Sequence, residues 1–198
     1  NLGMLPEVFL MFRIVSLVFA LNVISFDSQG SEMAKSQQFK AEILLKELAD
    51  LGDPEAQNNL GVLYQIGQSG RPNYSRAIFW YRKSAAKGFA KAQFNLGQLF
   101  KKGLGVPVDF LIAYKWFKKS AEQGFVPAKI NLASMYRYGQ GVRENRVRAL
   151  MWYELATVDQ SSNSLSIRDT YREMLTLQEI KEAKRLARAC SLRAFKSC

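Results

Sequence analysis

The chain has 198 residues, of which 48% are hydrophobic and 23% charged, a balance that favours a globular domain over a disordered chain. It has 28 lysines and arginines against 17 acidic residues and no histidine, which gives a net charge of +11. The missing histidine excludes serine–histidine and cysteine–histidine nucleophiles, histidine metal ligands and imidazole pH switches.

The apolar run at residues 14–26 predicts a secretory signal peptide that starts at Met11. Arg13 precedes the run, polar residues follow it, and cleavage is expected after Ser25 or Gly30. The chain is therefore expected to be periplasmic or secreted, without an integral membrane span in the mature form. A membrane anchor, which would place it at the inner membrane, and a buried core helix are the alternatives.

A step of 36 residues organises the middle of the chain, and self-similarity at a period of about 20–50 residues indicates a repeat array. It predicts three units, at residues 53–88, 89–124 and 125–160. The columns that keep the step are Trp80, Trp116 and Trp152; Ala77, Ala113 and Ala149; Leu60, Leu96 and Leu132; Asn59, Asn95 and Asn131; Gly67, Gly103 and Gly139; and Gly52, Gly88 and Gly124.

Each unit is expected to hold two helices. In the first unit, Asp53 and Pro54 suit the start of a helix, and Gly67 suits the left-handed conformation that ends one. The second helix follows Asn73, another good N-cap, which recurs as Asp109 and Asn145. Alanine and glycine columns let the helices approach closely, and the aromatic columns fill the gaps between units. The predicted buried positions are Ala56, Leu60, Leu63, Tyr64, Ala77, Trp80, Tyr81 and Ala85 with their equivalents.

Capping segments are expected at both ends of the array, because the end units of a stack meet water. Residues 31–52 carry half of the pattern and predict an N-terminal capping helix, and residues 161–198 predict the C-terminal cap. Thr176 and Glu179 have the spacing of a capping box, in which each side chain satisfies a free amide of the other residue. The C-terminal elements are a linker at 160–164 and helices at 165–175 and about 177–195.

The only two cysteines, Cys190 and Cys198, are eight residues apart, which is neither a disulfide framework nor a metal-site spacing. On one unbroken helix this separation is about 12 Å, too far for a disulfide unless the chain folds back. We therefore expect both cysteines to be unpaired.

The second unit carries Ala92, Asn95, Leu96, Gly97, Leu99, Phe100, Gly103, Gly105, Val106, Asp109, Ala113, Trp116, Lys119, Ala121 and Gly124. The third unit matches it at Gly139, Gly141, Val142 and Trp152, whereas the first departs from it in the turn at residues 69–72. This pattern resembles the Sel-1-like repeat of bacterial proteins, a relative of the tetratricopeptide repeat. The resemblance implies an all-α fold, a right-handed α/α superhelix of about three helix-turn-helix repeats. It also implies an interaction scaffold rather than an enzyme.

The first helix of each pair usually lines the concave face of such superhelices, so its positions outside the core are candidate contacts. Phe94 and Ile130 beside Lys101 and Arg137 would suit a peptide with apolar and acidic groups. The alternative is that Phe94 and Ile130 pack against the next unit. The candidate partner-binding residues are Asn58, Val62, Gln65, Phe94, Gln98, Lys101, Ile130, Ser134 and Arg137.

Three further patterns have structural interpretations. Ser84 and Lys87 have the S-x-x-K spacing of penicillin-recognising enzymes, but the companion motifs are absent and the Ser84 column continues as Ser120 without its lysine. The Asn59 column is expected to tie its helix to the neighbouring backbone, with a ligand-binding ladder as the alternative. The basic helix near the end of the chain is expected to be solvated, and a surface for acidic partners is its alternative.

The sequence therefore predicts a non-catalytic scaffold that binds a protein or peptide partner, including an acidic one, after export to the cell envelope. No catalytic residue, cofactor, metal site or nucleic-acid partner is expected. The alternative is a cell-envelope enzyme or a module that binds peptidoglycan or another glycan, because some proteins of the family that this chain resembles are linked to cell-wall processes.

Overall fold

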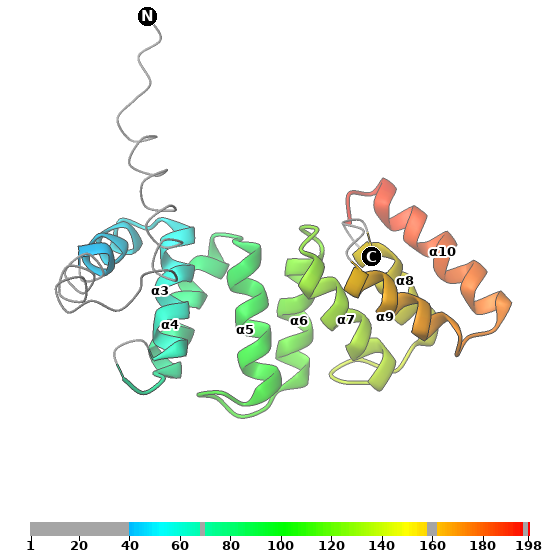
Figure 1. Ribbon diagram of the computed structural model, residues 1–198, viewed down its shortest axis with the longest axis horizontal. Helices are drawn as coiled ribbons and strands as arrows, with labels where there is room; N and C mark the ends of the chain where they lie inside the picture. The colour runs from blue at the N-terminus through cyan, green and yellow to red at the C-terminus, as the bar shows by residue number, and fades with distance from the viewer. Residues whose placement is uncertain (1–39, 68–69, 158–161, 196–197) are drawn as a thin grey trace, which may run out of the picture.

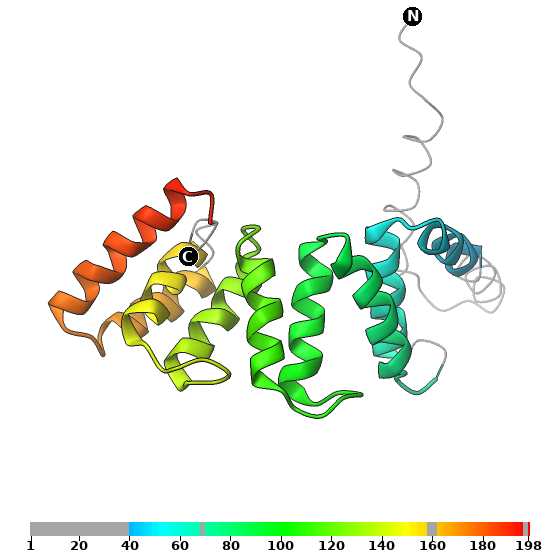
Figure 2. The same cartoon turned by 180° about the vertical axis from the view of Figure 1, so that it is seen from behind.

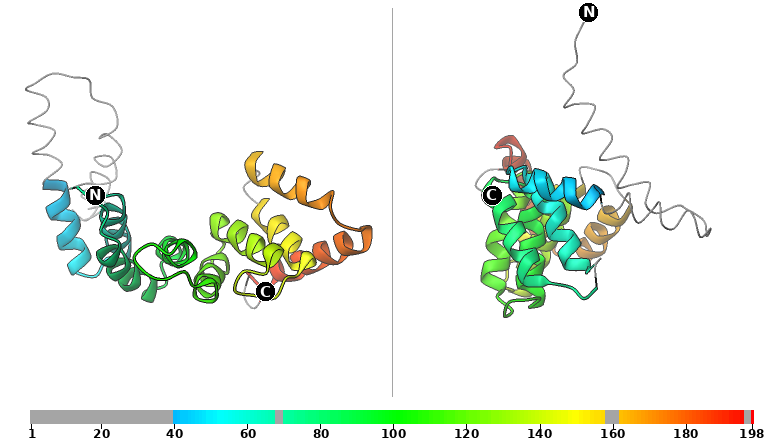
Figure 3. Two further views of the ribbon diagram at one scale, coloured as in Figure 1. Left: turned by 90° about the horizontal axis from the view of Figure 1, so that it is seen from below. Right: turned by 90° about the vertical axis from the view of Figure 1, so that its left-hand side faces the viewer.

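The structure is a computed structural model that describes residues 40–67, 70–157, 162–195 and 198. These residues form helices and no strand, which confirms the all-α class. The helices follow one another in chain order along one row (Figures 1 and 2), and the row is curved when it is seen from below (Figure 3, left). The predicted signal peptide lies outside the described residues.

The helices form pairs. α3 packs on α4, α5 on α6 and α7 on α8, while α4 contacts α5 and α6 contacts α7, so that each pair meets the next. The order is residues 40–50, α3 (Pro54–Ile66), α4 (Tyr74–Ala86), α5 (Ala90–Lys102), α6 (Phe110–Ala121), α7 (Val126–Tyr138), α8 (Arg146–Ala156), α9 (Ser162–Arg172) and α10 (Leu177–Leu192).

The predicted caps are confirmed. Asp53 accepts a hydrogen bond from the Ala56 amide at 2.6 Å, and Asn73, Asp109 and Asn145 each accept one from the amide three residues on, at 2.8–3.0 Å. A left-handed glycine ends the first helix of every unit, with φ values of 71°, 69° and 64° at Gly67, Gly103 and Gly139. The capping box of Thr176 and Glu179 is also formed, at the start of α10.

The core is built on small residues that face aromatic rings. Ala77, Ala113 and Ala149 are fully buried. A Cβ atom built on Gly61 would lie 2.6 Å from the Tyr81 ring, and one on Gly97 would lie 2.7 Å from the Phe117 ring. The second helix of each of these units therefore lies directly against the backbone of the first.

The tryptophan column is buried less evenly than we expected. Trp80 and Trp152 are only 7% and 1% exposed, whereas Trp116 is partly buried at the edge of the core. Trp116 instead has the Lys119 ammonium 4.8 Å above its ring centroid. Two of the three rings are thus core residues, and the third also forms part of the surface.

The C-terminal cap differs from its predicted bounds. Residues 162–164 were expected in a linker but belong to α9, where the Ser164 side chain is buried, and α9 ends at Arg172 rather than at residue 175. α10 packs on α8, as expected for a helix that closes the stack, but it ends at Leu192 rather than at residue 195.

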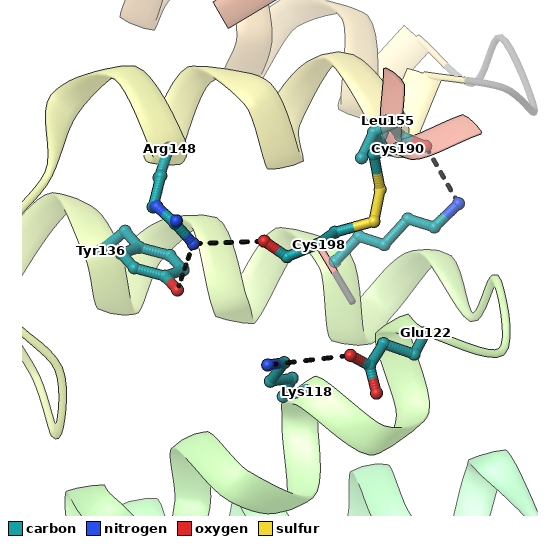
Figure 4. Close-up of a disulfide and its surroundings, with 8 residues drawn as sticks. Lys118, Glu122, Tyr136, Arg148, Leu155, Cys190 and Cys198 are labelled. Atoms are coloured by element: carbon teal, nitrogen blue, oxygen red, sulfur yellow. Dashed lines mark hydrogen bonds and ion pairs between the residues drawn. A yellow bond between two sulfur atoms is a disulfide. The ribbon is translucent and has the colours of Figure 1, made fainter. Parts of the chain in front are cut away.

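The expectation of two unpaired cysteines is wrong. Cys190 and Cys198 form a disulfide, with their Cα atoms 5.5 Å apart. The chain turns back after α10 because Ala194 and Phe195 adopt left-handed φ values of 50° and 64°. Figure 4 shows the disulfide and the Arg148 side chain, whose Nη1 donates to the Cys198 carbonyl oxygen at 3.1 Å. The end of the chain is therefore held beside α8.

Candidate partner-binding face

The nine candidate residues lie on α3, α5 and α7, the first helices of the three units. Side-chain hydrogen bonds join these helices to one another. The Asn95 amide donates to Asn58 Oδ1 at 3.0 Å, and the Lys101 ammonium donates to Asn131 Oδ1 at 3.2 Å. The three helices thus present one continuous face, and that face spans all three units.

The apolar candidates are packing residues. The Phe94 ring centroid lies 5.7 Å from that of Phe117 and 5.3 Å from that of Phe125, and Ile130 packs against the core of the third unit. Val62 packs against the cluster formed by α4, α5 and α6, and Asn58 is buried. Phe94 therefore packs against the next unit through Phe125, as the alternative interpretation expected, whereas Ile130 packs mainly against its own unit and the C-terminal helices.

The remaining candidates are polar and partly exposed: Gln65, Gln98, Lys101, Ser134 and Arg137. Three of them are fixed in place by neighbours. Gln65 Oε1 accepts a hydrogen bond from the Tyr81 hydroxyl at 2.8 Å. The Arg137 guanidinium lies 5.0 Å from the ring centroids of both Tyr138 and Tyr171. Lys101 is held by Asn131, so this face presents polar groups in defined positions.

Lys101 is not an ordinary surface lysine. Partial burial lowers its pKa, and repulsion from the neighbouring Lys102 lowers it further. Its one described hydrogen bond, to Asn131, leaves donors of the ammonium for another acceptor. A carboxylate brought close to Lys101 would favour the charged form, because an opposite charge offsets the cost of burial.

Asn95 and Asn131 of the asparagine column join neighbouring helices, although not through the backbone contact that we expected, whereas Asn59 does not. Asn95 donates to a side chain of α3, not to its backbone. Asn131 donates to the Pro127 carbonyl of its own helix at 2.9 Å and accepts from Lys101. Asn59 is exposed and accepts from the Asn58 amide at 3.2 Å.

The S-x-x-K pair is structural. The Ser84 hydroxyl is fully buried and donates to the Pro54 carbonyl at 2.6 Å. Ser120, one repeat later, is equally buried and donates to the Ala90 carbonyl at 2.8 Å. Lys87 donates to the Gly52 carbonyl. Each serine thus fastens the end of a second helix to the start of the first helix in its own unit.

Lys129 was not among the residues predicted from the sequence, and it is only 1% exposed. Its ammonium donates to the Leu155 carbonyl at 3.1 Å and lies 3.9 Å from the Phe195 ring centroid. Gln57 and Gln93 occupy the same column and donate to the Ala49 and Ala85 carbonyls. The sequence signal that could have revealed Lys129 is the replacement of glutamine by lysine in this repeat column. The lysine marks the contact between the third unit and the turn after α10.

In the part of the chain that the structure describes, no three histidine, cysteine, aspartate or glutamate side chains gather as metal ligands would. No helix in these ranges has the length and apolar character of a membrane span.

Stacked helix pairs joined by short turns define an α/α solenoid. The family described as Sel1 repeat matches residues 54–89, 90–125 and 126–157, just over half of the chain, and the chain belongs to this family. Sel1 repeats generally mediate protein interactions and are typically non-catalytic. The matched segments begin one residue later than the units predicted from the 36-residue step.

Two solved structures share the fold. One is the crystal structure of c5321, described as a protective antigen present in uropathogenic Escherichia coli strains and displaying an SLR fold. It has 33% sequence identity and a TM-score of 0.70, and the match covers 78% of this chain. The chain spans only 34% of the length of that antigen. The other is a Sel1 repeat protein from Oxalobacter formigenes, with 34% identity and a TM-score of 0.59, which covers 65% of this chain and 96% of its own. No curated protein matches the chain significantly.

We predict that Ser84→Ala lowers the free energy of unfolding by about 1 kcal/mol, because one buried hydrogen bond is lost. The protein should still fold, since Ala156 occupies the same column in the third unit. Denaturant unfolding measures the change, and Ser75→Ala, on an exposed position of α4, is the control. A fluorescent β-lactam should label neither variant nor the unchanged chain. If the β-lactam labelled the unchanged chain and Ser84→Ala abolished that labelling, the purely structural role of Ser84 would be refuted.

Proposed function

We propose that this chain is a non-catalytic scaffold that holds a protein or peptide partner on the face of α3, α5 and α7. The observation that supports the proposal is the fixed row of polar groups on this face. Asn58–Asn95 and Lys101–Asn131 hydrogen bonds connect the row from one unit to the next. A face whose side chains are already held in place loses less conformational entropy when a partner binds.

The partner that best suits this face is an extended segment with acidic groups. Gln65, Lys101 and Arg137 follow one another at the 36-residue step, so they occupy the same place on the first helices of successive units. The guanidinium of Arg137 binds a carboxylate in a forked geometry, and Lys101 supplies a second cation. A segment that crosses α5 and α7 would place one acidic group on each.

We further propose that the chain is exported to the cell envelope. Structural disulfides persist in oxidising compartments, and Cys190–Cys198 is such a bond. The predicted signal peptide at the start of the chain is a second support. The similarity to a protective antigen of uropathogenic Escherichia coli is a third, although it covers only part of that protein.

The face is tested by a charge reversal. We predict that Lys101→Glu with Arg137→Glu lowers partner recovery at least about tenfold in affinity purification from envelope extract, because the two introduced carboxylates repel acidic groups of the partner. Mass spectrometry identifies and quantifies the partner. The matched control is Lys102→Glu with Arg143→Glu, which makes the same charge change at exposed neighbouring positions.

Thermal unfolding shows whether each double variant remains folded. If unfolding shows that the reversal disturbs the stacking of Arg137 on Tyr171, the milder pair Lys101→Gln with Arg137→Gln replaces it. Equal recovery with the unchanged chain and with a folded reversal variant would exclude this face.

Export is tested on the full chain expressed in a bacterial host. We predict that the protein appears in the periplasmic fraction with the mass expected for cleavage after Ser25 or Gly30. Under non-reducing conditions, alkylation should label neither Cys190 nor Cys198, because both are in the disulfide. An uncleaved chain in the cytosolic fraction with both thiols reactive would contradict the proposal.

A further inference from the structure

Positive charge is concentrated in the first two units. Residues 54–121 contain 11 lysines and arginines and only two acidic residues, Glu55 and Asp109. Asp109 is used as the N-cap of α6, and the helices α4, α5 and α6 themselves contain no acidic residue. Nine of the eleven net charges of the chain therefore belong to one third of its length.

The second helices of these units repeat the same cations. Arg82 and Lys83 of α4 recur one step later as Lys118 and Lys119 of α6, whereas the third unit has Glu154 and Leu155 in these columns. Because equivalent columns of stacked repeats face the same side, α4 and α6 present one basic surface. This surface ends where α8 is covered by the C-terminal cap.

Aromatic rings position the lysines of this surface. The Lys83 ammonium lies 4.7 Å from the Phe79 ring centroid and 4.8 Å from that of Trp80. Lys119 repeats the arrangement over Trp116, also at 4.8 Å. In the part of the chain that is described, no ion pair involves Lys83, Lys115 or Lys119. The one acidic residue of the α6 groove, Glu122, pairs with Lys118 at 3.8 Å.

Exposed apolar side chains lie among these cations. Phe79 and Leu111 are each 52% exposed. A shallow groove of about 510 Å³ runs along α6, and its lining includes Ile112, Trp116 and Lys119. We call Phe79, Lys83, Leu111, Lys115 and Lys119 the lysine–aromatic face. It combines a spread of cations with apolar groups that are already in contact with water.

We propose that the lysine–aromatic face docks on the surface of a lipid bilayer that contains anionic phospholipid. Lysines gain from the negative surface potential of such a bilayer, and exposed Phe and Leu side chains gain by entering the interface between headgroups and acyl chains. The cations come from the second helices of two successive units rather than from one point, which suits many mobile headgroups. This face lies on α4 and α6, so it leaves the partner-binding face of α3, α5 and α7 free.

The test is co-sedimentation of the full, disulfide-bonded chain with lipid vesicles. Vesicles of phosphatidylglycerol and phosphatidylcholine should bind it, vesicles of phosphatidylcholine alone should not, and salt at about 0.5 M should release most of it. Lys83→Gln with Lys119→Gln should weaken binding about thirtyfold, since each cation near an anionic surface contributes about fivefold. Phe79→Ser with Leu111→Ser should also weaken binding, without any change in charge.

The matched control is Lys181→Gln with Lys184→Gln on α10, which removes the same charge from exposed positions elsewhere. Its binding should stay within about twofold of the unchanged chain, and circular dichroism confirms that every variant is folded. Equal weakening by the control would show attraction by net charge alone and overturn the proposal. Polyglutamate serves as a model of an acidic protein. If the chain bound it as tightly as it binds the vesicles, and if Phe79→Ser with Leu111→Ser did not change that binding, the face would be assigned to an acidic protein instead. Absence of vesicle binding by the unchanged chain would also overturn it.

Discussion

In the first two units the architecture depends on the contact between a bare helix backbone and an aromatic ring, and the third unit has the fully buried Ala133 in the same column. Gly61 and Gly97 leave no room for a Cβ atom, because the rings of Tyr81 and Phe117 occupy that space. This contact brings the two helices of a unit close enough for the alanine columns to meet. The larger rings, above all Trp80 and Trp152, then fill the space at the ends of the row. Interiors packed in this way have few voids.

In this packing, the residues that stabilise the fold differ from those that are available to bind a partner. The small and aromatic columns form one buried stripe along the helices of the repeats, and in the first two units a serine hydroxyl also ties the helix ends together. The positions outside this stripe are free to vary, and in this chain they form two different surfaces. Lys101 and Arg137 belong to the polar face of the first helices, while Lys83 and Lys119 belong to the second helices. A scaffold with both surfaces would hold a partner close to a membrane.

The sequence predicted the features that depend on local chemistry: the period, the helix caps, the glycine ends and most of the buried columns, with Trp116 as an exception. It did not predict features that depend on how distant groups meet. Ala194 and Phe195 have no intrinsic preference for a left-handed turn. The sequence therefore did not predict that the chain folds back and that Cys198 forms a disulfide with Cys190. Whether Phe94 is exposed or packed could be decided only from the position of the next unit, which supplies Phe125. Lys129 was visible as a break in a glutamine column, but its burial was not.

The most direct test of this account is the stability of Gly97→Leu, measured by denaturant unfolding. Leucine is the better helix former by about 1 kcal/mol, so helix propensity alone predicts a more stable protein. The contact with Phe117 predicts the reverse, a loss of about 1–3 kcal/mol, because the ring must move. Lys91→Leu, at an exposed position of the same helix, should change stability by less than about 0.5 kcal/mol. A Gly97→Leu protein as stable as the unchanged chain, or more stable, would contradict the account.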